Sequence, residues 1–487
     1  MCNRCAINTS PLRGEEWTME DLHLFWSRID VIGKDWGITY PDQQIEIISA
    51  SQMIDTMVTL GAPCAYDHWT LGKEALRMEQ DYLKGKTGLA LELVINSDPS
   101  IMYIVENNTL IQQGLVMAHA GIGHGSVFKN NYLFKQWTQP TSILDYMAFS
   151  KKYVSECEKK YGPADVELML DICHALQNYA VSHKEKKRTK GQSATRDKLY
   201  SELELDNTLI NIADRSYMHK LKKRIKSLEK EQPLYNFPEE NICYFLEKHA
   251  PLKIWQKEFL RITRKLAEYF YPQTKTKIVH EGWATFIEHR VFEELYARNQ
   301  ITEGGYLEFL RDHSNLVRQP GYDSPYFSGH INPYSIGYYI FEDLYRMTLN
   351  PTSADYELYP EICDTKWQES LMEIVKNYND SDLISRYLTP NVIRKLQLFA
   401  VETDIELKWV HIRGTANDDD TIRSILADEL VMFNRIPRLE IISVGEHTNR
   451  LDLKLYPAAG KVIDMDSAII VGEYIQMLWD GEVIIHE

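Results

Sequence analysis

The sequence predicts a mainly α-helical core that contains one β-hairpin, followed by a small α+β domain. Three observations lead to this fold class. Apolar residues recur at helical spacing through most of the core, a Ser-Asp-Pro-Ser turn near residue 98 separates two strand-like runs, and the last hundred residues interleave short strand-like runs with helical segments. The expected parts are a flexible tail over 1–15, the helical core over 16–394 and the α+β domain over 395–487.

Length, charge and cysteine content narrow the class of protein further. A chain of 487 residues is long enough for two or three domains. The net charge of −16 argues against non-specific binding to nucleic acid. No stretch reaches the ~20 apolar residues of a membrane span, and the N-terminus lacks a signal-peptide pattern, so we expect a cytoplasmic protein. Seven cysteines, of which only Cys2 and Cys5 are closely spaced, predict free thiols.

The first half of the chain is expected to pass from helices into a hairpin. Apolar spacing predicts helices over 17–32, 47–60 and 73–84. Strand-like runs over 89–96 and 101–106 then predict the hairpin. Asn107, Asn108 and Thr109 are expected to cap a helix that starts at Leu110. A hairpin in this place would bring a strand edge next to that helix, where an extended substrate could add a strand.

The second half is expected to be helical up to the C-terminal domain. Two helices are predicted within 143–182, and the polar, mostly basic run 183–235 is interpreted as a solvated linker or exposed helix, or as a docking surface for an acidic partner. Further helices are predicted from Pro238 and over 255–271, the latter ended by Pro272. In the C-terminal domain, strands are expected over 396–401, 405–412, 438–444 and 451–456, and helices over 419–432 and 465–479.

One stretch of the core carries a pattern typical of a metal site. His119 and His124 are five residues apart, with Gly121 and Gly123 between them. Two imidazoles and a carboxylate form a common catalytic zinc set. On a regular helix, residues five apart are rotated by roughly 140°, so the two rings converge only if the helix is distorted, and the glycines make a π-bulge inexpensive. The alternative is two unrelated histidines, one buried and one capping a helix end.

A second stretch is the candidate source of the carboxylate. Glu281, Thr285, Glu288 and His289 fall towards one side of a predicted helix that also carries large aromatic residues. The alternative interpretation is a buried polar network that joins helices.

A long loop rich in Tyr, Gly and Pro precedes the next helix, for which Asn332 is the expected N-cap and Pro333 the first residue. Loops of this length within compact domains are usually functional or disordered, and the aromatic content argues against disorder. Tyr326, His330 and Tyr334 are therefore candidates for substrate contacts or for stabilising an oxyanion.

Several of these motifs together resemble the SpoVR family, the stage V sporulation protein R family. They are 118–134 (AHAGIGHGSVFKNNYLF), 153–158 (YVSECE), 171–176 (DICHAL), 269–273 (YFYPQ), 281–286 (EGWATF) and 331–334 (INPY). The resemblance implies a cytoplasmic bacterial protein linked to spore-cortex formation in spore formers and to stress elsewhere. It also implies a PrkA-type serine kinase and a von Willebrand-like protein as possible partners. Gly125, His280 and His330 depart from the family pattern.

A second resemblance concerns chemistry. The segment Glu281-Gly-Trp-Ala is similar to the one that supplies the third zinc ligand in gluzincin peptidases. It implies a gluzincin-like core in which His119, His124 and Glu281 bind zinc. Ala120 occupies the position of the usual general-base glutamate, so either Glu106, Glu92 or Glu288 takes that role, or the site binds metal without hydrolysis.

Three hypotheses follow. The first is a zinc-dependent hydrolase that cleaves an amide bond in a peptide or a peptidoglycan precursor, with Glu106, Glu288, His330 and Tyr334 as candidate catalytic residues. The second is a non-catalytic regulatory or scaffold partner of the kinase assembly that keeps a vestigial metal site. The third is a di-iron protein that uses Glu92 or Glu106 with Glu281, Glu288 and the histidines, although the chain lacks the paired Glu-x2-His spacing of that class.

Overall fold

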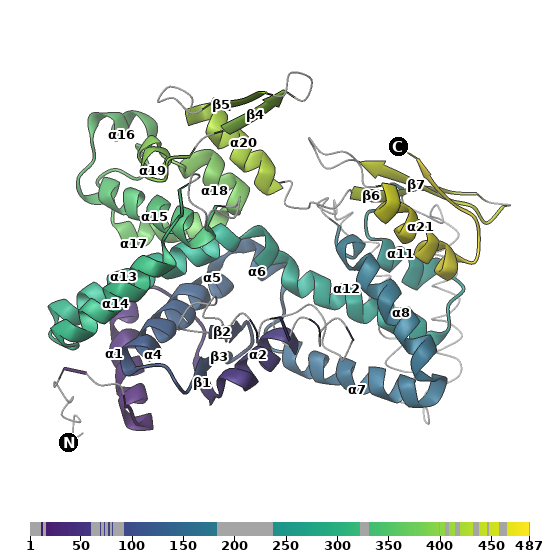
Figure 1. The fold of residues 1–487 in the computed structure, drawn as a ribbon, viewed down its shortest axis with the longest axis horizontal. Helices are drawn as coiled ribbons and strands as arrows, with labels where there is room; N and C mark the ends of the chain where they lie inside the picture. The colour runs from purple at the N-terminus through teal and green to yellow at the C-terminus, as the bar shows by residue number, and fades with distance from the viewer. Residues whose placement is uncertain are drawn as a thin grey trace, which may run out of the picture. The chain divides into compact units, whose positions relative to one another are not determined.

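The structure is a computed structural model, and Figure 1 shows its helices and strands along the chain. The described residues are 11–12, 16–59, 69, 73, 76–77, 80, 92–182, 237–321, 331–398, 400–404, 409–413, 419–431, 438–445, 448–456 and 465–486. Most of the predicted helix over 73–84 lies outside the described residues. So do the whole basic run 183–235, Tyr326 and His330.

The chain divides into two compact units. One comprises Met1–Asp171 and Lys265–Arg435, and the other Ile172–Arg264 and Ile436–Glu487. The boundary at residue 395 stays a prediction. Within the described residues, no helix combines the length and the apolar character needed to cross a bilayer.

The first unit is mainly helical. Its helices are α1 (Met19–Asp35), α2 (Ala50–Thr59), α4 (Leu110–Val116), η1 (Met117–His124), α5 (Gly125–Asn130), α6 (Tyr132–Trp137), α7 (Ile143–Tyr161), α13 (Lys277–Ala297), α14 (Glu303–Leu316), α15 (Pro333–Leu349), α16 (Ser353–Leu358), α17 (Trp367–Asn377), α18 (Asp380–Tyr387), α19 (Pro390–Lys395) and α20 (Asp419–Val431). Two more, α8 (Pro163–Leu176) and α12 (Ile254–Lys275), cross from one unit to the other.

The predicted hairpin is confirmed. Strands β2 (Glu92–Ile95) and β3 (Ser100–Val105) are antiparallel, and β1 (Gln43–Ile48) pairs with β3 in parallel, giving the order β1-β3-β2. Strand β1 corrects the expectation of a helix from residue 47, because the alternating Gln-Ile-Glu-Ile run pairs along β3 and the helix α2 starts only at Ala50.

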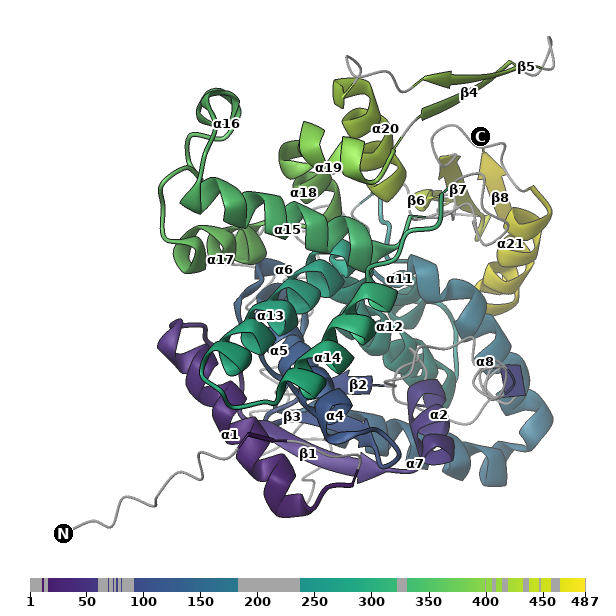
Figure 2. The same ribbon diagram turned by 60° about the vertical axis from the view of Figure 1, so that its left-hand side comes forward.

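Helix α13 is the centre of the first unit. It packs against both α15 and η1, and in both views it runs beside α15 (Figure 1, Figure 2). Gly282 of α13 faces Gly337 of α15 so closely that a Cβ on either residue would overlap the other backbone. The buried aromatic side chains of α13 include Trp283, Phe286 and Phe292, which belong to the main hydrophobic core. Burial of this surface holds α13 in place and fixes its polar residues.

The capping expectations hold. Thr109 caps α4 in a capping box with Gln112, and Asn332 caps α15 with Pro333 at its first turn. One helix end differs from the expectation: Pro272 lies inside α12, which continues to Lys275. A proline this near the C-terminus removes only one helical hydrogen bond, and Thr276 Oγ1 donates to the Pro272 carbonyl at 2.7 Å.

The second unit contains η2 (Gln177–Tyr179), α11 (Ile242–His249), α21 (Met465–Trp479) and a three-stranded sheet. In that sheet β7 (Leu451–Tyr456) is antiparallel to β6 (Arg438–Val444) and parallel to β8 (Val483–His486). The other expected C-terminal strands form a separate antiparallel pair in the first unit, β4 (Ala400–Asp404) with β5 (Trp409–Arg413).

Candidate metal centre

The two histidines lie on a stretch of π-helix. Residues Met117–His124 form η1, which is continuous with α4 before it and α5 after it. In a π-helix the hydrogen bonds join residues five apart, so these residues lie on one face. His119 and His124 accordingly face each other, with ring centroids 4.8 Å apart, and both are buried. The expected helix distortion is confirmed.

The glycines of η1 also allow close helix packing. A Cβ on Gly123 would lie 2.5 Å from the Cα of Ala284 in α13, and one on Gly121 would lie 2.5 Å from the ring of Trp26 in α1. Trp283 donates its indole N–H to Ser126 Oγ at 2.8 Å, which adds a polar contact between α13 and α5. Small residues in η1 therefore let α13 bring its carboxylates next to the imidazoles.

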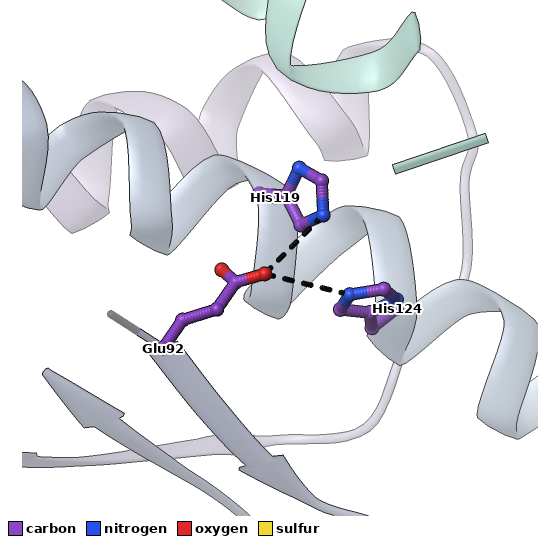
Figure 3. A group of neighbouring side chains, drawn as sticks. All are labelled: Glu92, His119 and His124. Atoms are coloured by element: carbon purple, nitrogen blue, oxygen red, sulfur yellow. Dashed lines mark ion pairs between the residues drawn. The ribbon is translucent and has the colours of Figure 1, made fainter. Parts of the chain in front are cut away.

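Four side-chain atoms converge at this place. Glu92 Oε1 lies 3.3 Å from His119 Nε2 and 3.7 Å from His124 Nε2. Glu281 Oε2 lies 3.6 Å from each of the same two nitrogens. Figure 3 shows Glu92 reaching from the start of β2 towards both rings. Glu92, His119 and His124 form a group of side chains able to hold a metal ion, and Glu281 extends it to four.

The residues present fit a divalent metal. Zinc bonds of about 2.0–2.2 Å in a tetrahedron place neighbouring donor atoms about 3.3–3.6 Å apart, close to the separations given above. His119 Nε2 and Glu281 Oε2 are buried and have no hydrogen-bond partner among the described residues. Buried polar atoms without partners are costly, and a metal ion at this point would satisfy both.

Glu288 holds His119 from the opposite side. Its Oε2 lies 2.6 Å from His119 Nδ1, and its Oε1 lies 3.0 Å from His313 Nδ1 of α14. Burial alone would raise the pKa of Glu288, but His119 and His313 hold it below its usual value, so the group is a carboxylate. A carboxylate only accepts hydrogen bonds, so His119 Nδ1 carries a proton and donates to Glu288, while its Nε2 faces the four-atom cluster.

His124 has a different partner. Its Nδ1 lies 2.7 Å from Nδ1 of His280 on α13. Burial, together with the neighbouring His124 and His119, keeps the pKa of His280 well below its usual value, so His280 is neutral.

Tyr334, at the start of α15, lies next to Glu281. Burial and the nearby carboxylates of Glu281 and Glu92 raise the pKa of the Tyr334 phenol well above its usual value. The phenol is therefore neutral, and its O–H can act as a hydrogen-bond donor.

The structure brings most of the sequence-predicted residues together. His119, His124 and Glu281 share one centre, Glu288 lies behind His119, and Tyr334 lies beside Glu281. Glu106 lies in the exposed turn after β3, and no described contact joins it to the histidines. His330 lies outside the described residues.

Three further residues stand out. Glu92, one of the three carboxylates considered above as a general base, lies in the group of side chains that could hold a metal ion. His280 and His313 were not assigned to the site from the sequence. His280 stands next to Glu281 and could have been found by that proximity, whereas His313 is 25 residues from Glu288 and carries no local signal.

The geometry favours one metal ion over two. Glu288 engages the far nitrogen of His119 and Glu106 is exposed, so neither supplies a second metal position. Among the described residues, Glu92, His119 and His124, together with the adjoining Glu281, form a single cluster of potential ligands.

Comparison with known proteins adds a family match. A family model described as SpoVR like protein matches residues 16–435. The uncharacterized protein YcgB of Escherichia coli (strain K12) is similar to this chain, at 37% identity over 479 residues, which covers 97% of this chain and 93% of that protein. No solved structure matches significantly.

Proposed function

The chain belongs to the SpoVR family, and from this premise we propose that it is a metal-dependent hydrolase with a gluzincin-like core that cleaves an amide bond. The observation that carries the proposal is the convergence of two imidazole nitrogens and two carboxylate oxygens. Two of these atoms are buried and have no hydrogen-bond partner within the described part of the chain. Zinc is the proposed metal, because two imidazoles with a carboxylate are a usual catalytic zinc set. The proposed setting is the cytoplasm, in sporulation or stress physiology.

In this proposal His119, His124 and Glu281 are the metal ligands. A bound zinc ion would supply Lewis acidity and lower the pKa of a water molecule. The Glu288 carboxylate keeps the His119 ring in the tautomer that presents Nε2. Tyr334 lies next to Glu281, so its O–H could donate a hydrogen bond to a developing oxyanion.

Glu92 is the proposed general base. Ala120 has no acid, Glu106 is exposed, and Glu288 is engaged by two histidines, which leaves Glu92 of the three carboxylates considered. Its Oε1 lies near both imidazoles, while its Oε2 is buried without a described partner. Glu92 would take a proton from the attacking water and pass it to the amine as the C–N bond breaks.

The proposed substrate is a peptide or a peptidoglycan precursor. The strand order β1-β3-β2 leaves β2 at one edge of the described sheet, and β2 begins with Glu92. An extended substrate that pairs with this edge would run next to the metal-facing carboxylate.

A second candidate is the non-catalytic partner of a kinase assembly, with a von Willebrand-like protein as a further partner. The observation that favours it is that Glu92 Oε1, only 3.3 Å from His119 Nε2, can act as a fourth ligand. A metal held by four protein ligands has no open position for water, which is typical of structural zinc sites.

One pair of measurements on the purified full-length chain tests both candidates. Metal content is measured by mass spectrometry for wild type, His119→Ala, Glu92→Gln and the exposed control Glu106→Gln. Turnover is measured with dye-labelled peptides and with muramyl peptides. We expect about one zinc per wild-type chain, lost in His119→Ala, and a Glu92→Gln protein that keeps zinc but loses turnover. Loss of zinc in Glu92→Gln would support the structural site instead, and a metal-free wild type purified without chelators would overturn the metal-dependent function.

A further inference from the structure

We propose that His280 is a positioning residue, whose Nδ1 accepts a hydrogen bond from Nδ1–H of His124 and thereby turns the Nε2 lone pair of His124 towards the metal. This inference rests on the proposed metal-binding function and adds to it a residue for which sequence reasoning assigned no role.

His124 and His280 share one proton between their Nδ1 atoms, and metal binding by His124 decides which ring carries it. The two Nδ1 atoms are 2.7 Å apart, so one nitrogen carries the proton and the other accepts it. A metal-bound His124 uses its Nε2 lone pair, so its proton resides on Nδ1. His280 is then the acceptor, and its own proton resides on Nε2.

The surroundings of His280 suit this neutral tautomer. His280 is 4% exposed, and its ring packs against Phe128 and Phe134, with centroid distances of 5.0 and 5.1 Å. His280 Nε2 is buried and has no hydrogen-bond partner among the described residues. Next to aromatic rings an N–H is tolerated as a weak donor to a π-face, whereas a charged imidazolium would have to lose its hydration.

The position of His280 in α13 explains how one helix restrains both nitrogens of the same ring. Successive residues of a helix point about 100° apart, so His280 and Glu281 leave α13 in different directions. Glu281 Oε2 approaches His124 Nε2 at 3.6 Å, while His280 approaches the Nδ1 at the other side of the ring. The imidazole of His124 is therefore fixed between two neighbouring residues.

The two ligand histidines differ in the charge of the group that holds them. His119 donates to the carboxylate of Glu288, and His124 donates to a neutral imidazole. An anionic acceptor increases the basicity of its imidazole more than a neutral one does. Loss of His280 should consequently weaken metal binding by misplacing His124, with little change in the charge at the site.

The test uses three variants at one position. In His280→Asn the side-chain Oδ1 takes about the place of Nδ1 and remains an acceptor. In His280→Gln the oxygen lies one bond further out, and His280→Phe has no acceptor. Co²⁺ and Zn²⁺ affinities of the full-length chain are measured by competition with a chromophoric chelator, and the visible absorption of bound Co²⁺ reports the geometry. Melting temperatures control for folding.

We expect His280→Asn to bind both ions within about threefold of wild type with the same Co²⁺ spectrum. His280→Gln and His280→Phe should bind about 10- to 100-fold more weakly, with altered spectra. Equal affinity and identical spectra in all four proteins would overturn the role of His280 and leave the metal site standing. A wild type that binds neither ion would overturn the metal-dependent function, and the role of His280 with it.

A second measurement does not depend on whether the variants fold. Nitrogen-15 NMR of histidine-labelled, Zn²⁺-loaded wild type should show the proton on Nδ1 of His124 and on Nε2 of His280. The reverse pair of tautomers would overturn the proposal.

Discussion

The two helical segments that form the candidate metal centre bring their polar side chains together by different means. Segment η1 relies on its backbone: a π-helical turn of small residues places His119 and His124 on one face. Helix α13 is regular, and its carboxylates Glu281 and Glu288 are seven residues apart, which is close to two turns. With that spacing, Glu281 lies near Nε2 and Glu288 near Nδ1 of the same His119 ring. The small residues of the distorted segment η1 thus make room for the regular helix α13. Substitutions can perturb each segment separately.

The largest effect is expected from breaking the contact between the two segments. Gly123→Val places a side chain where Ala284 of α13 already lies, so η1 and α13 must separate. Overpacking at such a contact costs about 3 kcal/mol of the free energy of unfolding and should also abolish metal binding. Urea unfolding measures the loss. Gly304→Ala is the matched control, since a Cβ there meets nothing within 4 Å, and a similar loss in both variants would contradict the close-packing account.

A smaller effect is expected on the α13 side from Glu288→Gln. The amide keeps the shape of the side chain but removes the charge that fixes His119 and His313. Zinc affinity should fall about 10- to 100-fold, as measured by chelator competition. Glu293→Gln, on the same helix but largely outside the site, is the control. Unchanged zinc affinity in Glu288→Gln would show that this carboxylate does not support the ligand.

The N-terminus of α13 provides a pH-dependent test. Burial raises the pKa of Asp380 to about 7, against the lowering effect of backbone N–H groups of 277–279. The folded protein then holds a proton between about pH 4 and pH 7 that the unfolded chain has released, so stability falls as pH rises through this window and levels off above it. The slope for one such group is at most about 1.4 kcal/mol per pH unit.

Asp380→Asn keeps the acceptor for Val279 N–H but has no proton to lose. Its stability relative to wild type should therefore rise between pH 5 and pH 7, as measured by urea unfolding at several pH values. A constant difference across this range would contradict the raised pKa.

The smallest effect is expected at the start of the η1 side. Thr109 caps α4, the helix that leads into η1, and also donates to Glu308 at 2.7 Å. Thr109→Ala should cost about 1 kcal/mol in the free energy of unfolding, and Thr109→Ser should cost less because it keeps the cap. If both variants lost the same free energy of unfolding, the effect would come from the Thr109 methyl group and not from the cap.

Local patterns predicted more of the fold than of the site. The hairpin, the Thr109 and Asn332 caps and the distortion between His119 and His124 follow from neighbouring residues, and they are present. Strand β1 was missed because its pairing with β3 joins residues more than fifty apart. Pro272 was expected to end α12, whereas the helix tolerates it near its end.

The contacts that complete the site act over still longer separations. Glu288 meets His119 across 169 positions, and His280 meets His124 across 156. The periodicity of neighbouring residues cannot predict these two contacts, because they depend on how tightly η1 packs against α13. The residue Glu92 could be proposed from the sequence as one of three carboxylates, but its selection needed its distances to the two imidazoles.

The long separation between the two segments has a consequence for biosynthesis. Glu281 follows His119 by 162 positions, so at about 5–20 residues per second it leaves the ribosome about 8 to 32 s later. During that interval the nascent chain offers Glu92 and both histidines but lacks the carboxylates of α13. The proposed ligand set is therefore complete only after translation has passed α13, so full-affinity metal loading would mark chains whose first unit has been synthesised beyond that helix.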